Sequence, residues 1–299
     1  MTNNGVEQKP SETAMFAALR RTIANKEFAN EKFGPDYLAE FFLPAHFRFF
    51  LKFEKIRANT REKLDGVLPG LTEYMIARTA HFDKLFVDAL ENKTPQIVLL
   101  GAGYDTRAYR FANLNRSTKI FELDIAPTQN RKKKCLKKAR VTVPSQVNFV
   151  PIDFNKESLA DVLERAGYDH RDKTLFIWEG VSYYLETESV QATLEFVRQT
   201  SHAENRLAFD CTVSISDQDL DDYYGVREFV QTMKEHHANE ALLFSIEAGQ
   251  IGSFLENRGL KLIDLMKNDE IESAYLMSAD GKLIGHITGH FRFVLASKK

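Results

Sequence analysis

The stretch QIVLLGAG, residues 96–103, decides the fold of this 299-residue chain. Gln96 to Leu100 is a short, continuous apolar run, and Gly101-Ala102-Gly103 follows it directly. Such a run bounded by glycine is typical of a strand buried on both faces of a parallel sheet. Glycine at its end lets the backbone turn tightly and approach a ligand without a Cβ clash. We therefore expect a buried strand, a ligand-binding loop, and a helix starting near Asp105 or Thr106.

Further strand candidates follow along the chain, with helical segments such as 157–165 and 189–203 between them. They are residues 119–123, 147–152, 174–178 and 206–213. Alternating strands and helices predict an α/β fold with a parallel sheet covered on both faces. Residues 260–265 and 290–295 predict a closing pair of strands, in which the last strand runs antiparallel.

The first 94 residues have a different pattern and predict an N-terminal helical cap or lid on a core of residues 95–299. Met15, Phe16, Leu19 and Ile23 recur at helical spacing after Ser11, a candidate N-cap, and residues 72–90 predict a long amphipathic helix. Many of the 23 phenylalanines lie before residue 90. Composition favours a helical layer packed on the sheet, and the alternative is an apolar lid over a substrate pocket.

Composition excludes several classes of protein. Hydrophobic residues make up 43% and charged residues 27%, as in ordinary globular proteins and unlike disordered chains. No apolar run approaches the roughly 20 residues of a membrane-spanning helix. The net charge of −2 gives no argument for a nucleic-acid partner, and we interpret the basic run at residues 131–140 as a solvated helix face.

Cysteine usage and the polar N-terminus bear on the compartment. Two cysteines, Cys135 and Cys211, cannot form a disulfide framework, and residues 1–10 do not look like a signal peptide. No set of zinc-like ligands is present in the sequence. We expect a cytoplasmic protein with no metal, no membrane partner and no nucleic-acid partner, and the oligomeric state stays open.

Acidic residues recur where the predicted strands end. Glu122 and Asp124 end the second strand, Asp153 the third and Glu179 the fourth. Ligands of open parallel sheets bind outside the carboxyl ends of the strands, so these side chains should converge near Gly101. A carboxylate accepts hydrogen bonds from both hydroxyls of a ribose. The pattern predicts a nucleoside-type cofactor.

Several blocks of the sequence then match one family. They are Ala77-Arg78-Thr79, LLGAGYDTRAYRF at 99–111, FELD at 121–124, PIDF at 151–154, WEGVSYYL at 178–185, and the C-terminal blocks at 244–260 and 289–296. From about residue 11 to 297 the chain resembles class I S-adenosylmethionine (SAM)-dependent methyltransferases of the leucine carboxyl methyltransferase family. The resemblance implies a Rossmann-like sheet of seven strands in the order 3-2-1-4-5-7-6, with the seventh strand antiparallel, and SAM as the cofactor.

The resemblance also implies roles for the matching residues. Arg78 would bind the methionyl carboxylate of SAM, and Glu179 would lie near its amino group. The loop under the cofactor would be formed by Gly101 and Gly103. Asp124 would hold the ribose. Its spacing makes Glu122 the second candidate, because residues two apart on a strand point the same way. Asp153 and Phe154 would flank the adenine.

The acceptor is less defined, because the chain departs from the family pattern around Tyr183 and Tyr184. These tyrosines and Asp210 are our candidates for catalytic groups in the acceptor pocket. We expect in-line O-methylation of a small-molecule carboxylate or hydroxyl. The alternatives are a protein C-terminal carboxyl methyltransferase, an NAD-dependent oxidoreductase, which the missing third glycine of the loop disfavours, and a SAM-binding protein without turnover.

Overall fold

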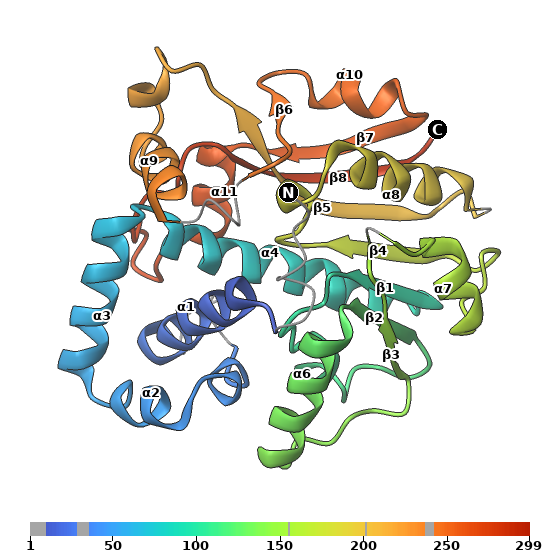
Figure 1. Cartoon of the computed structure of the whole chain (residues 1–299), viewed down its shortest axis with the longest axis horizontal. Coiled ribbons are helices and arrows are strands. Elements are labelled where there is room, and N and C mark those ends of the chain that lie inside the picture. The colour runs from blue at the N-terminus through green and yellow to red at the C-terminus, as the bar shows by residue number, and fades with distance from the viewer. Residues whose placement is uncertain (1–9, 29–35, 155, 201, 237–241) are drawn as a thin grey trace.

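A central β-sheet forms the core of the protein, which we describe from a computed structural model (Figure 1). The structure describes residues 10–28, 36–154, 156–200, 202–236 and 242–299. The strands are β1 Gln96–Leu100, β2 Lys119–Asp124, β3 Val147–Pro151, β4 Thr174–Trp178, β5 Arg206–Ser214, β6 Ile246–Glu247, β7 Leu260–Met266 and β8 Phe291–Lys298. Each of the seven strands expected from the sequence is present within a few residues of its predicted bounds.

The strand order is β3-β2-β1-β4-β5-β8-β7, and the two-residue β6 pairs with β5 beside this path. β1 to β5 run parallel, and β8 pairs antiparallel with both β5 and β7. With β6 set aside, this is the predicted order, and its last strand in the chain is the antiparallel one. The parallel strands therefore all end at one edge, as a ligand site of this fold requires.

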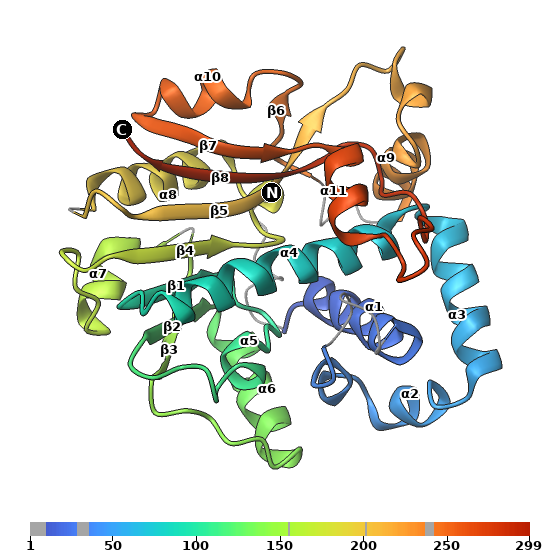
Figure 2. The same cartoon turned by 180° about the vertical axis from the view of Figure 1, so that it is seen from behind.

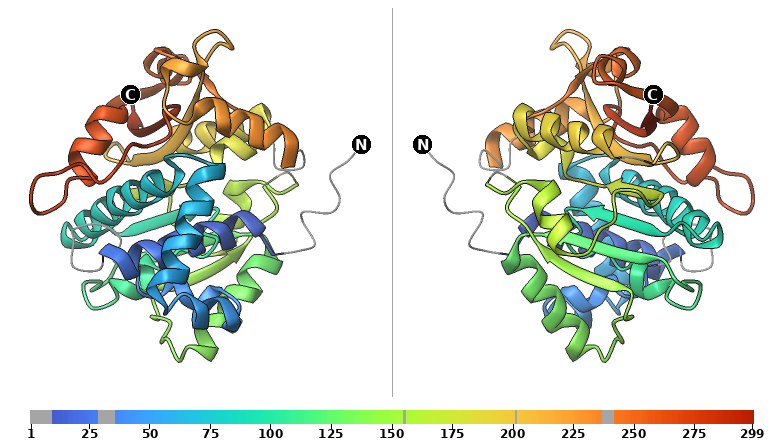
Figure 3. Two further views of the ribbon diagram at one scale, coloured as in Figure 1. Left: turned by 90° about the vertical axis from the view of Figure 1, so that its left-hand side faces the viewer. Right: turned by 90° about the vertical axis from the view of Figure 1, so that its right-hand side faces the viewer.

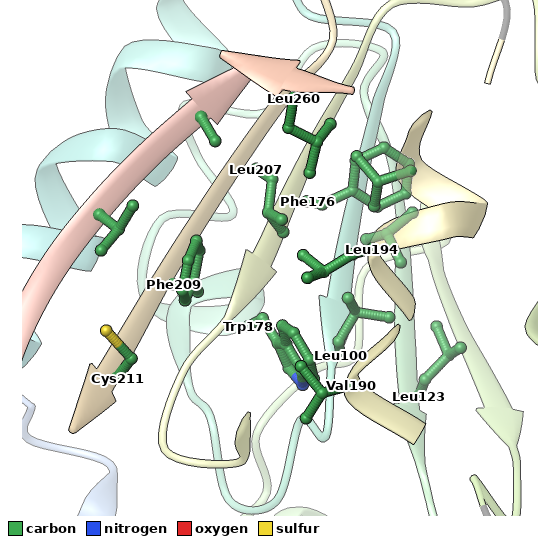
Figure 4. Packing of buried hydrophobic residues seen from close by; sticks show 14 of the residues in the cluster. Leu100, Leu123, Phe176, Trp178, Val190, Leu194, Leu207, Phe209, Cys211 and Leu260 are labelled. Carbon is green, nitrogen blue, oxygen red and sulfur yellow. The ribbon is translucent and has the colours of Figure 1, made fainter. Parts of the chain in front are cut away.

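One face of the sheet is covered by α7 Leu159–Arg165, α8 Thr187–Gln199 and α10 Ile251–Glu256. Val98 and Leu100 of β1 point into this cluster, together with Phe176 and Trp178 of β4 and Leu194 of α8 (Figure 4). Phe176 lies at the centre of it and is fully buried.

The opposite face is covered by α4 Leu71–Glu91, which lies in front of the sheet in the view of Figure 2. Phe82 and Phe86 of α4 pack against Ile97 and Leu99, the β1 residues that alternate with those of the first cluster. Alternate residues of the apolar run at 96–100 thus pack on opposite faces of the sheet, as expected for a strand that is buried on both sides.

The remaining helices surround this core. The α-helices are α1 Glu12–Phe28, α2 Ala45–Phe50, α3 Glu54–Val67, α5 Arg107–Arg110, α6 Ala126–Lys138, α9 Val226–His236 and α11 Asn268–Tyr275. The 3₁₀ helices are η2 Ala39–Phe42, η3 Ser182–Tyr184 and η4 Leu220–Asp222. Ser11 caps α1 as predicted, because its Oγ accepts from Ala14 N at 3.0 Å. Helices α9 and α11 were not predicted.

The N-terminal elements lie at one end of the molecule and the C-terminal strands at the other (Figures 1 and 3). α1 packs on η2 and on α4, and α3 also contacts α4. This arrangement places the described residues 10–28 and 36–67 at the end of the molecule where the parallel strands have their carboxyl edge. Their role as a lid stays a prediction.

Among the described phenylalanines before residue 90, some are buried and others are exposed. Phe42, Phe82 and Phe86 are buried, as a packed helical layer requires, whereas Phe47, Phe49, Phe50 and Phe53 are exposed. The packing interpretation therefore accounts for only part of this composition. Within the described residues, no helix is both long enough and apolar enough to cross a membrane.

We expect Phe176→Ala to lower the free energy of unfolding by about 3–5 kcal/mol, because a fully buried aromatic ring leaves a cavity between α8 and the sheet. Urea denaturation followed by circular dichroism measures the change. Phe49→Ala is the matched control, since this ring is exposed, and it should stay within about 0.5 kcal/mol of the wild type. Similar losses for both variants would contradict the packing described here.

Candidate functional site

The loop after β1 is shaped by glycine at the carboxyl edge of the sheet. Gly101 has φ +71°, and a Cβ there would lie 2.5 Å from Cγ2 of Val181. The β1 and β4 loops can approach each other this closely only because residue 101 has no side chain. The helix predicted to follow, α5, begins at Arg107 and is only one turn long.

Asp124 at the end of β2 is joined to this loop. Its Oδ2 accepts from Gly103 N at 2.6 Å, and its Oδ1 accepts from Ile125 N at 2.8 Å. Burial raises the pKa of Asp124 to about 6, although these two backbone donors favour the ionised form. A carboxylate with one donor on each oxygen keeps further lone pairs for a ribose diol.

Glu122 points the same way as Asp124 but lies deeper in the protein, and its predicted contact with the ribose stays a prediction. It is completely buried, its Oε2 lies 2.7 Å from Lys132 Nζ of α6, and its Oε1 accepts from Tyr109 Oη at 2.9 Å. Burial also raises the pKa of Glu122. Both oxygens are thus engaged inside the protein, where Glu122 acts as an internal ion-pair partner.

Arg78 of α4 lies at the centre of the site and is almost completely buried. Its Nε lies 3.0 Å from Glu179 Oε1, and its Nη1 lies 3.3 Å from Asp210 Oδ2. Gly180 follows Glu179 with φ +72°, and a Cβ there would lie 2.9 Å from Nη1 of Arg78. The structure thus brings together Arg78 and Glu179, which lie 101 positions apart in the sequence.

Asp210 of β5, one of our candidates for the acceptor pocket, lies behind Arg78. It is completely buried, its Oδ1 accepts from Gly180 N at 2.6 Å, and its Oδ2 accepts from the hydroxyl of Tyr74. The carboxylate is thus enclosed by contacts of the protein, one of them with Arg78. The predicted role of Asp210 in the acceptor pocket stays a prediction.

Tyr183 belongs to the same buried network. Arg78 Nη1 donates to its hydroxyl at 3.2 Å, and that hydroxyl donates to Asp210 Oδ2 at 3.4 Å. Burial and the nearby Asp210 raise the pKa of Tyr183, so the phenol stays protonated. The inward hydroxyl makes Tyr183 a support for Arg78. Tyr184 packs edge-on against the Tyr183 ring and is only partly buried, so its place in the acceptor pocket stays a prediction.

Arg107 extends the network toward the glycine loop. Its Nη1 lies 2.6 Å from both Glu179 Oε2 and Asp105 Oδ2, and its Nε lies 2.8 Å from Asp83 Oδ1. Asp83 also accepts from Arg110 Nη1 at 2.6 Å. The DTR block at 105–107 was noted in the sequence, but this pairing with residues of α4 and the β4 loop was not predicted.

The N-terminal region is tied to the same loop through Asp36. This carboxylate accepts from Thr106 Oγ1 at 2.8 Å and pairs with Arg21 Nε of α1 at 2.9 Å. Arg21 also donates through Nη2 to Tyr104 O at 2.8 Å. Sequence reasoning missed Asp36 and Arg21, because neither stands near a recognisable motif.

Asp153 and Phe154 follow β3 and lie next to the end of β2, where Ile152 N donates to Asp124 O at 3.0 Å. Asp153 Oδ2 pairs with the exposed Lys156 at 2.7 Å, and Phe154 is partly buried against the core. Both therefore lie on the edge predicted for the adenine, and their contact with it stays a prediction.

The residues present fit the amino-acid end of SAM. The Nε of Arg78 is buried without a well-directed hydrogen bond, although Glu179 lies within ion-pair distance. A zwitterion placed here would give its carboxylate to Arg78 and its ammonium group to Glu179, satisfying both charges.

An open sheet with this strand order, a glycine loop after β1 and an acidic residue at the end of β2 defines a class I SAM-dependent methyltransferase. The family model described as leucine carboxyl methyltransferase matches residues 14–198, and the chain belongs to this family. This finding sets aside the NAD-dependent oxidoreductase.

Curated relatives agree with this assignment. The chain is similar to YktD of Bacillus subtilis (strain 168), named as a candidate SAM-dependent methyltransferase, with 29% identity over 218 residues, or 72% of this chain and 70% of that one. It is also similar to a protein of the same description from Mycobacterium sp. (strain JLS), with 27% identity over 222 residues, or 72% and 70% of the two chains.

A solved structure shares the whole fold. A DUF574 family protein from Streptomyces avermitilis aligns with a TM-score of 0.63 over 98% of this chain and 99% of that one. The two sequences are 12% identical, so this likeness concerns the fold alone.

We expect the SAM affinity to fall as the pH drops through about 6, the pKa of Asp124 in the free protein. Ribose hydroxyls donate to the ionised carboxylate, so SAM favours ionised Asp124 and lowers the pKa of this group. Affinity is then fully present above pH 6 and decreases below it, by up to about tenfold per pH unit. Calorimetric titration across pH 5–8 measures this slope. Asp124→Asn should bind more weakly and without the slope, and an unchanged slope would assign the titration to another group.

Glu122→Gln should lower the free energy of unfolding by about 3–5 kcal/mol, because it leaves the buried ammonium group of Lys132 without its counter-charge. SAM affinity of the folded variant should stay near the wild-type value, in contrast to Asp124→Ala. Urea denaturation and calorimetry measure the two quantities. The double variant Glu122→Gln with Lys132→Met should recover much of the stability. A large loss of affinity in stable Glu122→Gln protein would support Glu122 as a ribose ligand.

Proposed function

We propose that this methyltransferase transfers the methyl group of SAM directly, by in-line displacement, to an oxygen of a small molecule. The acceptor is a carboxylate or a hydroxyl group, and the carboxylate is favoured. The preference for a carboxylate rests on one observation: several acidic side chains of the site are each paired with an arginine. Asp105, Asp83 and Glu179 each face Arg107, and Asp210 faces Arg78.

A hydroxyl acceptor must lose a proton during the transfer, whereas a carboxylate needs no base. Carboxylates held by arginine are poor bases. His290, near the start of β8, is buried against Phe229, and among the residues that the structure describes neither of its ring nitrogens has a hydrogen-bond partner. Burial and the nearby Arg292 lower the pKa of His290 to about 3, so this imidazole is also a poor base. These observations support an acceptor that is already an anion.

In this proposal the chain binds and orients its two substrates. Arg78 holds the methionyl carboxylate, Glu179 the ammonium group and Asp124 the ribose, while Asp153 and Phe154 flank the adenine. Bound SAM supplies a methyl group made electrophilic by its sulfonium. The protein contributes proximity and orientation and excludes water from the reacting groups.

A second acceptor class follows from the description of the family model, which names a leucine carboxyl group. A peptide C-terminus is also a carboxylate and would need no base. The small molecule and the peptide tail therefore share the chemistry of the acceptor and differ in its size.

The test uses purified protein with SAM labelled in the methyl group and three sets of acceptors. These are small carboxylates, phenols, and a short peptide ending in leucine with a free carboxyl group. A methyl ester releases volatile labelled methanol in mild base and an aryl methyl ether does not, so the product identifies the acceptor oxygen. Base-labile product from small carboxylates supports the proposal. Transfer to the peptide alone, or base-stable label from phenols alone, would overturn the preferred acceptor.

Arg78→Lys should weaken SAM binding by about tenfold or more. Lysine keeps the charge but lacks the planar guanidinium group, whose nitrogens contact Glu179 and Asp210 at the same time. Calorimetric titration measures affinity, and a urea melt confirms that the variant folds. Arg116→Lys, outside the Arg78 network, is the matched control and should bind SAM like the wild type. Equal affinities for Arg78→Lys and the wild type would remove Arg78 from the proposed site.

A further inference from the structure

The residues after η2 form an exposed aromatic cluster, which we call the Phe face. It consists of Phe47, Phe49, Phe50 and Phe53, which are 43%, 56%, 48% and 50% exposed. Phe49 packs edge-on against Phe50 and Phe53, with ring centroids 5.7 and 5.5 Å apart. Contiguous apolar surface of this kind on a folded protein marks a binding surface.

The inward side of the same segment explains why these rings face outward. Leu43 and Leu51 are buried in an apolar cluster with Phe42, Tyr104 and residues of α1. These leucines hold both ends of α2 against the protein. The phenylalanines between and after them are left on the outer side of the helix and its C-terminal turn.

Exposed basic side chains lie beside the Phe face on α6. We call Lys133, Lys134, Lys137, Lys138 and Arg140 the basic face, and all five are exposed. A hollow of about 210 Å³ lies between the segment that carries the Phe face and α6, lined by Phe41, Leu43 and Arg48 on one side and by Cys135 and Lys138 on the other. α2 and α6 accordingly lie at the same end of the molecule (Figures 1 and 3).

Both segments lack acidic residues. The sequence contains no Asp or Glu between residues 41 and 53, where Arg48 and Lys52 alternate with phenylalanines, and none between 125 and 152. The whole chain has a net charge of −2, so positive charge is concentrated at this end against the overall balance. The partner should therefore be apolar inside and anionic at its surface.

We propose that the Phe face and the basic face together bind the surface of an anionic lipid membrane. Exposed phenylalanines enter the headgroup boundary of a bilayer, and adjacent lysines attract anionic lipids. Neither contribution alone gives firm attachment, and this end of the molecule combines the two. The proposal departs from our expectation of no membrane partner, and it does not depend on the identity of the methyl acceptor.

Two other occupants fit the same surface less well. A second copy of the chain would place two basic faces against each other, and their like charges would repel. Nucleic acid would need separate ring faces on which bases can stack, whereas these rings pack edge-on against one another.

The test is sedimentation of the full chain with lipid vesicles of phosphatidylcholine alone, or with about 30% phosphatidylserine. We expect binding to the anionic vesicles, little binding to the neutral ones, and a loss of binding at high salt. Phe49→Ser with Phe53→Ser should lower the vesicle partition about tenfold or more, and so should Lys134→Glu with Lys137→Glu. SAM titration and urea melts show that both double variants remain folded.

The matched control changes the same residue classes at the opposite end of the molecule (Figure 1). Lys261→Glu with Ile263→Ser on β7 alters one exposed lysine and one exposed apolar side chain and should bind vesicles like the wild type. Absence of vesicle binding, or equal loss in this control, would overturn the proposal. So would dimerisation in analytical ultracentrifugation that the Phe face variant abolishes, or tighter binding to a single-stranded oligonucleotide than to anionic vesicles.

Discussion

The buried guanidinium of Arg78 is the constraint on which the site depends. A cation taken out of water costs several kcal/mol unless counter-charges surround it. Glu179 after β4 and Asp210 on β5 supply them, so one arginine fixes α4, the β4 loop and β5 relative to one another. The glycine at 180 follows from this arrangement, since any side chain there would collide with the guanidinium. The edge that receives the cofactor is thus held by charge, while the sheet beneath it is held by apolar packing.

Much of the fold could be predicted because hydrophobic periodicity and glycine positions are local signals. The run at 96–100 could be assigned as a strand from its own residues, and the order of the strands came from the family resemblance. Helix α9 carries the same local signal, because Val226, Phe229, Val230 and Met233 recur at helical spacing, and it could have been predicted. Helix α11 is short and polar, and its buried Ile271 packs in a cluster with residues of β8 that are distant in sequence.

The site shows the same division between local and distant signals. Residues two positions apart on a strand point to the same face, and this rule placed Glu122 and Asp124 on one face of β2. The rule gives the direction of a side chain but not how deeply it is buried. Glu122 lies under α6, where it pairs with Lys132, whereas Asp124 lies two residues nearer the carboxyl edge of the sheet. Asp210 was a candidate for the acceptor pocket because it belongs to a strand-like run, and only the contacts of Tyr74 and Gly180 reveal that it is enclosed. Depth depends on residues from other elements, which no local pattern contains.

The short 3₁₀ helix η2 joins the two functional regions of the molecule. Phe42 at its end stacks on Tyr104 of the glycine loop, with ring centroids 4.8 Å apart and planes within 3° of parallel. Arg131 of α6 donates to Phe42 O at 3.2 Å, so the basic helix holds the same residue from its other side. The Phe face begins a few residues further on, and its position is therefore set by contacts with the cofactor loop and with α6. A membrane bound at that face would lie next to the elements that cover the carboxyl ends of β1 and β2. An acceptor dissolved in such a membrane would have a short path to the methyl donor, which gives the exposed phenylalanines a functional reason to remain uncovered.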